Sequence, residues 1–134
     1  MATIKVTCGI IFNDEDKVFL CRRNPEKSMG GYWEFPGGKV EEGESYEECL
    51  KRELLEELDM DVRVKDHFIT VQHDYSTFEI ELIAFICHFQ TSSFAMMDHD
   101  RYEWVKLSNL LDKELAPADV PIWNSLIARV CQLK

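Results

Sequence analysis

Two adjacent glycines followed by a strongly acidic helical segment are the feature that most restricts how this chain can fold. The stretch begins at Phe35 and runs FPGGKVEEGESYEECLKRELLEELDMDV. Residues 45–58 within it predict an amphipathic helix, because Leu50, Leu54 and Leu58 recur at every fourth position. A leucine stripe of this kind must be buried, so the helix is expected to pack against another layer of the fold.

Three glutamates crowd the face of this helix beside the leucines. At about 100° per residue, Glu53, Glu56 and Glu57 fall within roughly a third of a turn of one another. Such like charges destabilise a solvated helix by about 0.2–0.5 kcal/mol per pair, and by more when they are partly buried. A solvated acidic face is the ordinary interpretation. Here the acids cluster instead of alternating with lysine, and carboxylates beside a glycine carbonyl are suited to a hard cation, Mg2+ or Mn2+.

Strand-like segments lie on both sides of the acidic helix. They are residues 4–12, 17–21, 62–73, 77–89 and 102–107. Residues 24–38 are rich in Gly and Pro and are predicted to be loop.

The C-terminal part predicts more helix. Ser108 and Asn109 are suited to cap a short helical turn, and Pro121 stands near the start of a second amphipathic helix. The apolar residues of that helix are Trp123, Leu126, Ile127, Val130 and Leu133. Strands before, between and after two helices predict an α/β domain in which helices cover a mixed β-sheet.

Length and composition narrow the function. A chain of 134 residues is expected to form one domain, 1–134. It contains no apolar run of the roughly 18 to 20 residues that a membrane helix needs and begins without a secretory signal, which favours a cytoplasmic protein. Its five cysteines form no CxxC pair, so buried reduced thiols are expected rather than disulfides or zinc. The net charge of -10 argues against a nucleic-acid polymer as partner, and an anionic ligand would need its charge neutralised.

The acidic segment resembles a known signature. Its order is Gly38, five residues, Glu44, seven residues, Arg52-Glu53-Leu54, one residue, Glu56-Glu57, one residue, and Asp59-Met60. This pattern resembles the box of the Nudix hydrolase superfamily. The family usually has glycine where this chain has Asp59. That glycine would end the helix with a positive φ, which Asp tolerates better than most residues, so the turn is expected to be kept.

The resemblance implies an α/β/α sandwich with a metal-binding loop and helix, and hydrolysis of a nucleoside diphosphate linked to another group. It implies Mg2+ as the cofactor, with Mn2+ as a substitute. The implied ligands are Glu53, Glu56, Glu57 and a backbone carbonyl of Gly37 or Gly38. Arg52 would orient the carboxylates, and Glu44 would tie the loop to the helix. Glu53 or Glu56 would accept a proton from the attacking water.

Asp98 is a further possibility for the metal cluster, because relatives often place an acid before the strand that contains Trp104. An exposed loop acid is an equally good interpretation.

Resemblance beyond the box points to the MutT-like branch, the nucleoside triphosphate pyrophosphohydrolases. It is carried by Arg22-Arg23, by the run from Trp33 to Glu41, by Glu103-Trp104 and by the sequence LAPADVP. Such enzymes convert an NTP or dNTP to an NMP and pyrophosphate. Arg23 would contact phosphate, although an arginine at a strand end is also often solvated.

Asp119 is the residue that indicates which nucleotide base the protein recognises. MutT-like enzymes that remove 8-oxo-dGTP commonly have Asn at this position, whereas an ionised Asp only accepts hydrogen bonds and suits the N4 amino group of cytosine. LAPADVP also resembles the CTP pyrophosphohydrolase subgroup, so CTP or a 5-substituted dCTP is the expected substrate. A protonated Asp119 would donate and restore purine recognition, and Asp119 is also suited to capping the last helix. Phe35 and Phe78 are predicted either to stack on the base or to belong to the core.

Two other functions stay open. One is an 8-oxo-dGTP hydrolase that sanitises the nucleotide pool, and the other is a Nudix module that binds a nucleotide without turnover. The complete set of acids, with Arg52 present, argues against the module. The sequence leaves open whether the protein is a monomer or a homodimer.

Overall fold

The computed structural model describes residues 2–27, 30–108 and 113–132. The elements are β1 (Ala2–Phe12), β2 (Val18–Arg23), β3 (Trp33–Glu34), β4 (Gly37–Lys39), α1 (Tyr46–Leu58), β5 (Met60–Asp74), β6 (Phe78–Ser92), β7 (His99–Val105) and α2 (Val120–Gln132). A 3-10 turn, Pro117–Asp119, leads directly into α2.

The strands form one mixed sheet, as the sequence predicts. Its order is β3-β2-β1-β6-β5, with β4 paired to β1 and β7 paired to β2. Only one of these pairings is parallel: β6 runs beside the whole length of β1, from Ala2 opposite Phe78 to Phe12 opposite His88. On its other side β1 pairs with β4 and then with β2. This arrangement brings β4, which carries the glycine pair, to the middle of the sheet.

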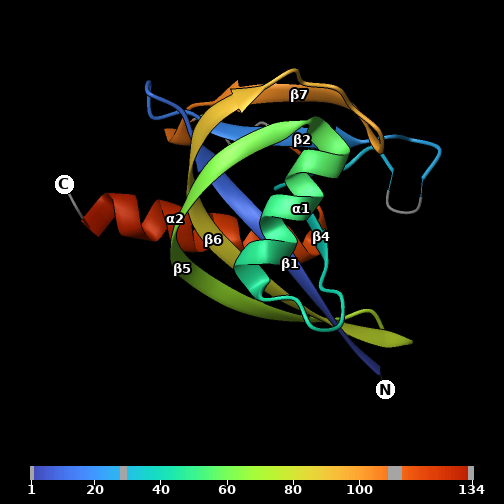
Figure 1. The fold of residues 1–134 in the computed structure, drawn as a ribbon. Helices are drawn as coiled ribbons and strands as arrows, with labels where there is room; N and C mark the ends of the chain where they lie inside the picture. Colours follow the sequence, from blue (N-terminus) through green and yellow to red (C-terminus); the bar gives the residue numbers. More distant parts are fainter. Residues whose placement is uncertain (1, 28–29, 109–112, 133–134) are drawn as a thin grey trace.

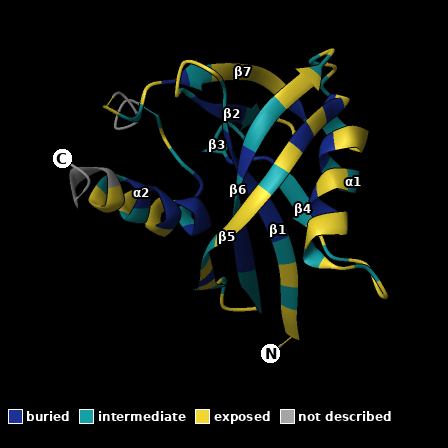
Figure 2. Cartoon of the chain, turned by 60° about the vertical axis from the view of Figure 1, so that its left-hand side comes forward, coloured by how far each residue is buried: buried dark blue, intermediate teal, exposed yellow. Residues whose placement is uncertain are grey.

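The two helices lie on opposite faces of the sheet, α1 in front and α2 behind in Figure 1. Leu50, Leu54 and Leu58 of α1 are buried in the cluster that includes Phe19 and Cys87. The apolar residues of α2 close a second cluster on the other face. Figure 2 shows the same division, with buried residues on the inner side of α1 and exposed residues on its outer side. The predicted α/β/α sandwich is therefore confirmed.

The loop prediction for residues 24–38 is wrong in part, because β3 and the start of β4 lie within it. Both strands are too short to show an alternating pattern. The glycines of β4 reflect close packing rather than a turn: a Cβ on Gly37 would lie 1.9 Å from the backbone oxygen of Thr7. Glycine is needed here because two backbones approach each other closely.

The other elements lie near their predicted positions. The strands β5 and β6 are longer than expected, and β7 begins at His99 instead of Tyr102. Asn109 and Leu133 lie outside the described residues, and so does the side chain of Val130. The thiols of Cys8, Cys21, Cys49 and Cys87 are buried, as predicted. Across the described ranges, no helix is both long enough and apolar enough to span a membrane.

Candidate active site

The acidic helix α1 has a well-defined cap at each end. Ser45 accepts a hydrogen bond from the Glu48 N–H, while the Glu48 carboxylate accepts one from the Ser45 N–H, which completes a capping box. At the other end Asp59 adopts φ 50° and ψ 42°, the left-handed conformation, and its N–H reaches the carbonyls of Leu54 and Leu55. The expectation that Asp59 replaces the usual glycine without loss of the turn is confirmed.

Gly38 lies directly against Glu53. A Cβ on Gly38 would stand 2.2 Å from Glu53 Cδ, so only glycine lets the strand and this carboxylate come together. The N–H of Val40 donates to the Lys5 carbonyl, and bonded pairs alternate along an antiparallel ladder. The pair formed by Thr7 and Gly38 therefore falls at a hydrogen-bonding position, while the Gly37 carbonyl turns away from β1. Of the two glycine carbonyls named by the sequence, that of Gly37 is therefore the better candidate for a cation ligand.

Arg52 connects the loop with the acidic helix. Its Nε and Nη2 donate to the two carboxylate oxygens of Glu44, and each of these hydrogen bonds is 2.8 Å long. Nη2 also donates to the Lys39 carbonyl at 3.1 Å. Its Nη1 lies 2.9 Å from Glu53 Oε1 and 3.1 Å from Glu56 Oε2. Glu44 also accepts from the backbone of the preceding loop. The structure thus brings Arg52, Glu53 and Glu56 together.

Glu57 belongs to the same cluster. Burial, together with the negative charges of Glu53, Asp98 and Glu34, raises the pKa of Glu57 to about 8. Its carboxyl also makes a hydrogen-bonding contact with Glu53. The ionised form of Glu57 is therefore disfavoured, and a bound cation would relieve this cost.

Asp98 is held near this cluster by its loop. The N–H of Met97 donates to the Glu57 carbonyl at 3.3 Å, and the Asp98 carbonyl accepts from Asn24 at 3.0 Å. The Asp98 carboxylate lies 3.4 Å from Lys27 Nζ. The interpretation of Asp98 as a member of the acidic cluster gains support from its effect on the pKa of Glu57.

The candidate metal ligands are of the kind that a hard divalent cation prefers. They are all oxygens, from carboxylates and one peptide carbonyl. Among the residues that the structure describes, no three Asp, Glu, His or Cys side chains are arranged to hold an ion in the present conformation. Arg52 Nη1 instead pairs with both Glu53 and Glu56.

Glu34 is a functional candidate that the sequence analysis missed. Its carboxylate lies 3.7 Å from Arg23 Nη1 and 3.6 Å from His99 Nε2. Its negative charge contributes to the raised pKa of both Glu57 and Asp119. The expected phosphate contact, Arg23, therefore lies beside a carboxylate whose charge acts on Glu57. The only sequence signal was the position of Glu34 just before the glycine strand.

Asp119 is buried and does not cap α2 by any hydrogen bond seen among the described residues. Its Oδ2 accepts instead from the Phe35 N–H at 2.8 Å, across 84 positions of sequence. Burial, and then the charge of Glu34, raises the pKa of Asp119 well above its usual range. Phe35 itself is a core residue, 2% exposed, so its ring belongs to the packing of the domain.

Phe78 is half-buried and stacks on Tyr75, with ring centroids 5.3 Å apart. Burial and the charge of Asp119 raise the pKa of Tyr75, whose hydroxyl also meets the backbone of Ala118. The tip of the β5–β6 hairpin therefore reaches the segment that holds Asp119. Tyr75 was missed because a tyrosine beside a turn carries no functional signal in one sequence.

The fold and the site together point to a hydrolase that acts on phosphoanhydrides. Residues 7–125 match the family model described as the NUDIX domain. The CTP pyrophosphohydrolase of Escherichia coli (strain K12) is 34% identical over 128 residues, which cover 96% of this chain and 94% of that protein. The 8-oxo-dGTP diphosphatase of Proteus vulgaris is 40% identical over 83 residues, 62% of this chain and 74% of that protein. The solution structure of the E. coli ORF135 protein has a TM-score of 0.81 and 34% identity, covering 96% of this chain and 91% of that one.

The chain belongs to the Nudix family and is a MutT-like Nudix hydrolase, an enzyme that cleaves the pyrophosphate linkage of a small-molecule nucleotide. Nudix hydrolases use divalent metal ions. The two relatives are named for different nucleotides, CTP and 8-oxo-dGTP. The choice between them has to be argued from the site.

Proposed function

We propose that the enzyme is a Mg2+-dependent nucleoside triphosphate pyrophosphohydrolase that cleaves CTP or a 5-substituted dCTP to the NMP and pyrophosphate. The observation that carries the proposal is the fixed orientation of the Asp119 carboxyl, whose Oδ2 accepts from the Phe35 N–H. This contact leaves Oδ1 for a base. An ionised Oδ1 accepts from the N4 amino group of cytosine, whereas the O6 atom of a guanine is itself an acceptor and is repelled.

Because the pKa of Asp119 is raised, 8-oxo-dGTP is a second candidate substrate. A neutral carboxyl can also donate, so its Oδ1 can donate to N3 of cytosine or equally to O6 of an oxidised guanine. CTP is therefore compatible with both protonation states of Asp119, whereas a contact between Asp119 and O6 of 8-oxo-dGTP requires the neutral state. The name of the Proteus vulgaris relative agrees with this alternative.

The acidic cluster would supply the chemistry. Glu53, Glu56 and Glu57, with the Gly37 carbonyl, would hold the cation, and Arg23 would contact a phosphate. When bound, Mg2+ neutralises the triphosphate and lowers the pKa of a coordinated water. The proton of the attacking water passes to Glu53 or Glu56. The Glu56 side chain is 60% exposed and that of Glu53 14%, so Glu56 is open to solvent.

The substrate is tested by measuring pyrophosphate release from CTP, 5-methyl-dCTP, 5-hydroxy-dCTP, 8-oxo-dGTP and dATP in the presence of Mg2+. We expect a cytidine nucleotide to give the highest kcat/KM. A higher kcat/KM for 8-oxo-dGTP than for every cytidine nucleotide would refute the argument from Asp119.

The hydrolytic role is tested by Glu53→Gln and Glu57→Gln. Each replacement removes a charged cation ligand, and we expect kcat to fall by at least about a hundredfold while the circular dichroism spectrum is unchanged. Glu47→Gln is the matched control, because Glu47 lies exposed in the first turn of α1. Nucleotide binding without turnover by the wild-type protein would support the binding module instead.

A further inference from the structure

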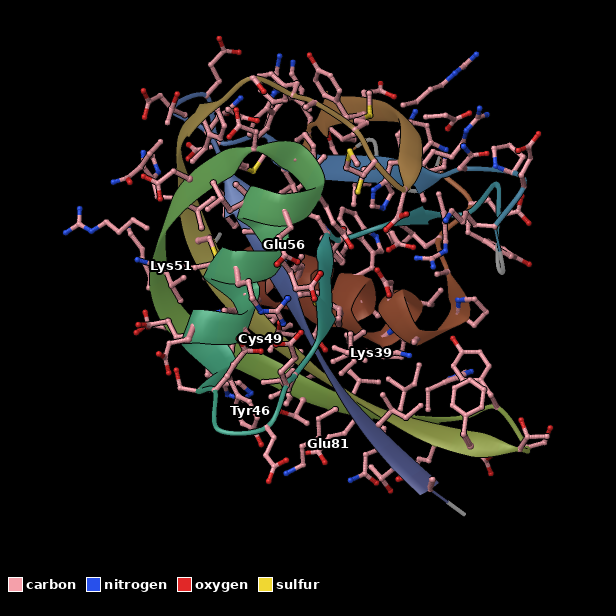
Figure 3. All side chains as sticks on the ribbon, turned by 45° about the vertical axis from the view of Figure 1, so that its right-hand side comes forward. Lys39, Tyr46, Cys49, Lys51, Glu56 and Glu81 are labelled. Atoms are coloured by element: carbon pink, nitrogen blue, oxygen red, sulfur yellow. The ribbon has the colours of Figure 1, made fainter. Side chains whose placement is uncertain are left out.

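A buried polar pair lies beneath the glycine strand β4. Thr7 Oγ1 and Cys49 Sγ are 3.2 Å apart, and both residues are fully buried. Cys49 Sγ is also 3.3 Å from the Lys39 carbonyl and 3.6 Å from the Gly38 carbonyl, while Thr7 Oγ1 is 3.5 Å from the latter. In Figure 3, Cys49 lies on the side of α1 that faces Lys39, and Lys51 points away on the other side. The pair thus faces two consecutive carbonyls of β4.

The pair has one hydrogen-bond donor for each of these two carbonyls. Thr7 has one O–H and Cys49 one S–H, so the pair can donate two hydrogen bonds at a time. The arrangement that serves both carbonyls has Thr7 donating to Gly38 and Cys49 donating to Lys39. Arg52 donates to the same Lys39 carbonyl. The three side chains therefore come from β1 and α1 and converge on one short length of β4.

We propose that Thr7 and Cys49 are positioning residues, which fix β4 against α1 so that the Gly37 carbonyl and the Glu53 carboxylate face the same divalent cation. The clearance is small, because Gly38 touches Glu53 with no space for a methyl group. A shift of β4 would therefore displace Glu53 and the Gly37 carbonyl relative to each other. The proposal rests on the metal site of the proposed function. It differs from a role in packing, which would stabilise the domain without changing the affinity for metal.

The affinity of the metal-free protein for Mn2+ separates the two roles. Free Mn2+ is measured by electron paramagnetic resonance during a titration, so the readout does not depend on catalysis. Thr7→Val keeps the shape of the side chain and removes the hydroxyl, and we expect it to weaken Mn2+ binding about tenfold, as does the loss of an outer-shell partner. Thr7→Ser restores the hydroxyl and is expected to restore the affinity. Cys49→Ala and Cys49→Ser form a second pair with the same expectation.

Cys87→Ala is the matched control. Cys87 is buried on the same side of the sheet as Cys49, but its Sγ contacts the Phe85 carbonyl of its own strand. Its replacement is expected to lower the melting temperature and leave Mn2+ affinity unchanged. Equal weakening in Cys87→Ala and Cys49→Ala would overturn the proposal, because general loosening of the core would then explain both.

Two further outcomes are decisive. Wild-type Mn2+ affinity, within twofold, in Thr7→Val and Cys49→Ala would overturn the positioning role and leave the metal site intact. An absence of Mn2+ binding by the wild-type protein would overturn the metal site itself. If Cys49→Ala does not fold, Thr7→Val and Thr7→Ser decide alone.

Discussion

Arg52 holds Glu44 through two parallel hydrogen bonds, from Nε to Oε2 and from Nη2 to Oε1, each 2.8 Å long. The hydrogen bonds from Arg52, and then one from the Glu41 backbone, lower the pKa of Glu44 to about 2. The remaining guanidinium nitrogen contacts Glu53 and Glu56. One planar group therefore sets the position of the loop and of two carboxylates of the candidate metal site.

Replacing Arg52 by Lys tests this arrangement. Lysine keeps the positive charge but offers a point charge instead of a planar fork, so it does not hold Glu44 and Glu53 together. We expect Arg52→Lys to lower kcat by about ten- to a hundredfold at saturating Mg2+. Steady-state kinetics measures the effect, with Arg63→Lys on the exposed part of β5 as control. A kcat equal to that of the wild type would show that charge alone is sufficient.

The two glycines of β4 are expected to respond differently to alanine. A Cβ on Gly37 meets the Thr7 backbone oxygen, which has no room to move, so Gly37→Ala is expected to destabilise the fold by ~1–3 kcal/mol or more. A Cβ on Gly38 meets the side chain of Glu53, which can rotate. Gly38→Ala is therefore expected to lose most activity with a smaller change in stability.

Chemical denaturation and pyrophosphate release, measured on both variants, check this difference. The explanation fails if Gly38→Ala retains full kcat, because Glu53 would then be free to move without consequence.

The sequence predicted the parts of the site that are local in the chain. The spacing from Gly38 to Asp59 is a property of one loop and one helix, and both helix ends follow from residue types at single positions. The Asp59 turn was predictable for the same reason.

The rest of the site depends on contacts between distant segments. The bond from Phe35 to Asp119 spans 84 positions, and Glu34 becomes important only because β3, β7 and the acidic cluster meet around it. The hydrophobic periodicity of the sequence carries no information about such long-range contacts. The strand β4 was missed because it is three residues long and two of them are glycines.

The raised pKa of Glu57 gives the metal-free protein a defined pH dependence. The folded pKa, about 8, lies above the ordinary value of 4.5, so folding takes up a proton between these values. The contribution of Glu57 to stability is fully present at pH values below its ordinary pKa, and it is lost as the pH rises through its pKa in the folded protein. We therefore expect the melting temperature of the metal-free protein to fall as the pH rises from 4.5 to about 8. The melting temperature of Glu57→Gln is expected to fall less steeply over the same range.

Differential scanning calorimetry in the presence of a chelator measures the effect, and Glu47→Gln should keep the wild-type slope. Equal slopes for wild type and Glu57→Gln would contradict the assignment. Added Mg2+ is expected to flatten the wild-type slope, because cation binding favours the ionised carboxylate.

The protonation of Asp119 gives a pH dependence to substrate choice. Burial raises its pKa, so the fraction of ionised Asp119 grows as the pH rises toward that value. Ionised Asp119 accepts from the N4 amino group of cytosine and repels an oxidised guanine whose O6 atom faces Asp119. The ratio of kcat/KM for CTP to that for 8-oxo-dGTP is therefore expected to rise with pH. Because both substrates use the same metal site, the titration of Glu57 affects both terms and cancels in the ratio.

Asp119→Asn is the variant that isolates this effect. Asparagine has the same shape and its carbonyl oxygen can still accept from the Phe35 N–H, so the fold is expected to be kept. Its amide donates to O6 at every pH, and the ratio should become independent of pH and about tenfold lower than in the wild type at high pH, the equivalent of one buried hydrogen bond gained or lost. A wild-type ratio that stays constant with pH, as in the Asn variant, would mean that Asp119 supports the Phe35 backbone without contacting the base.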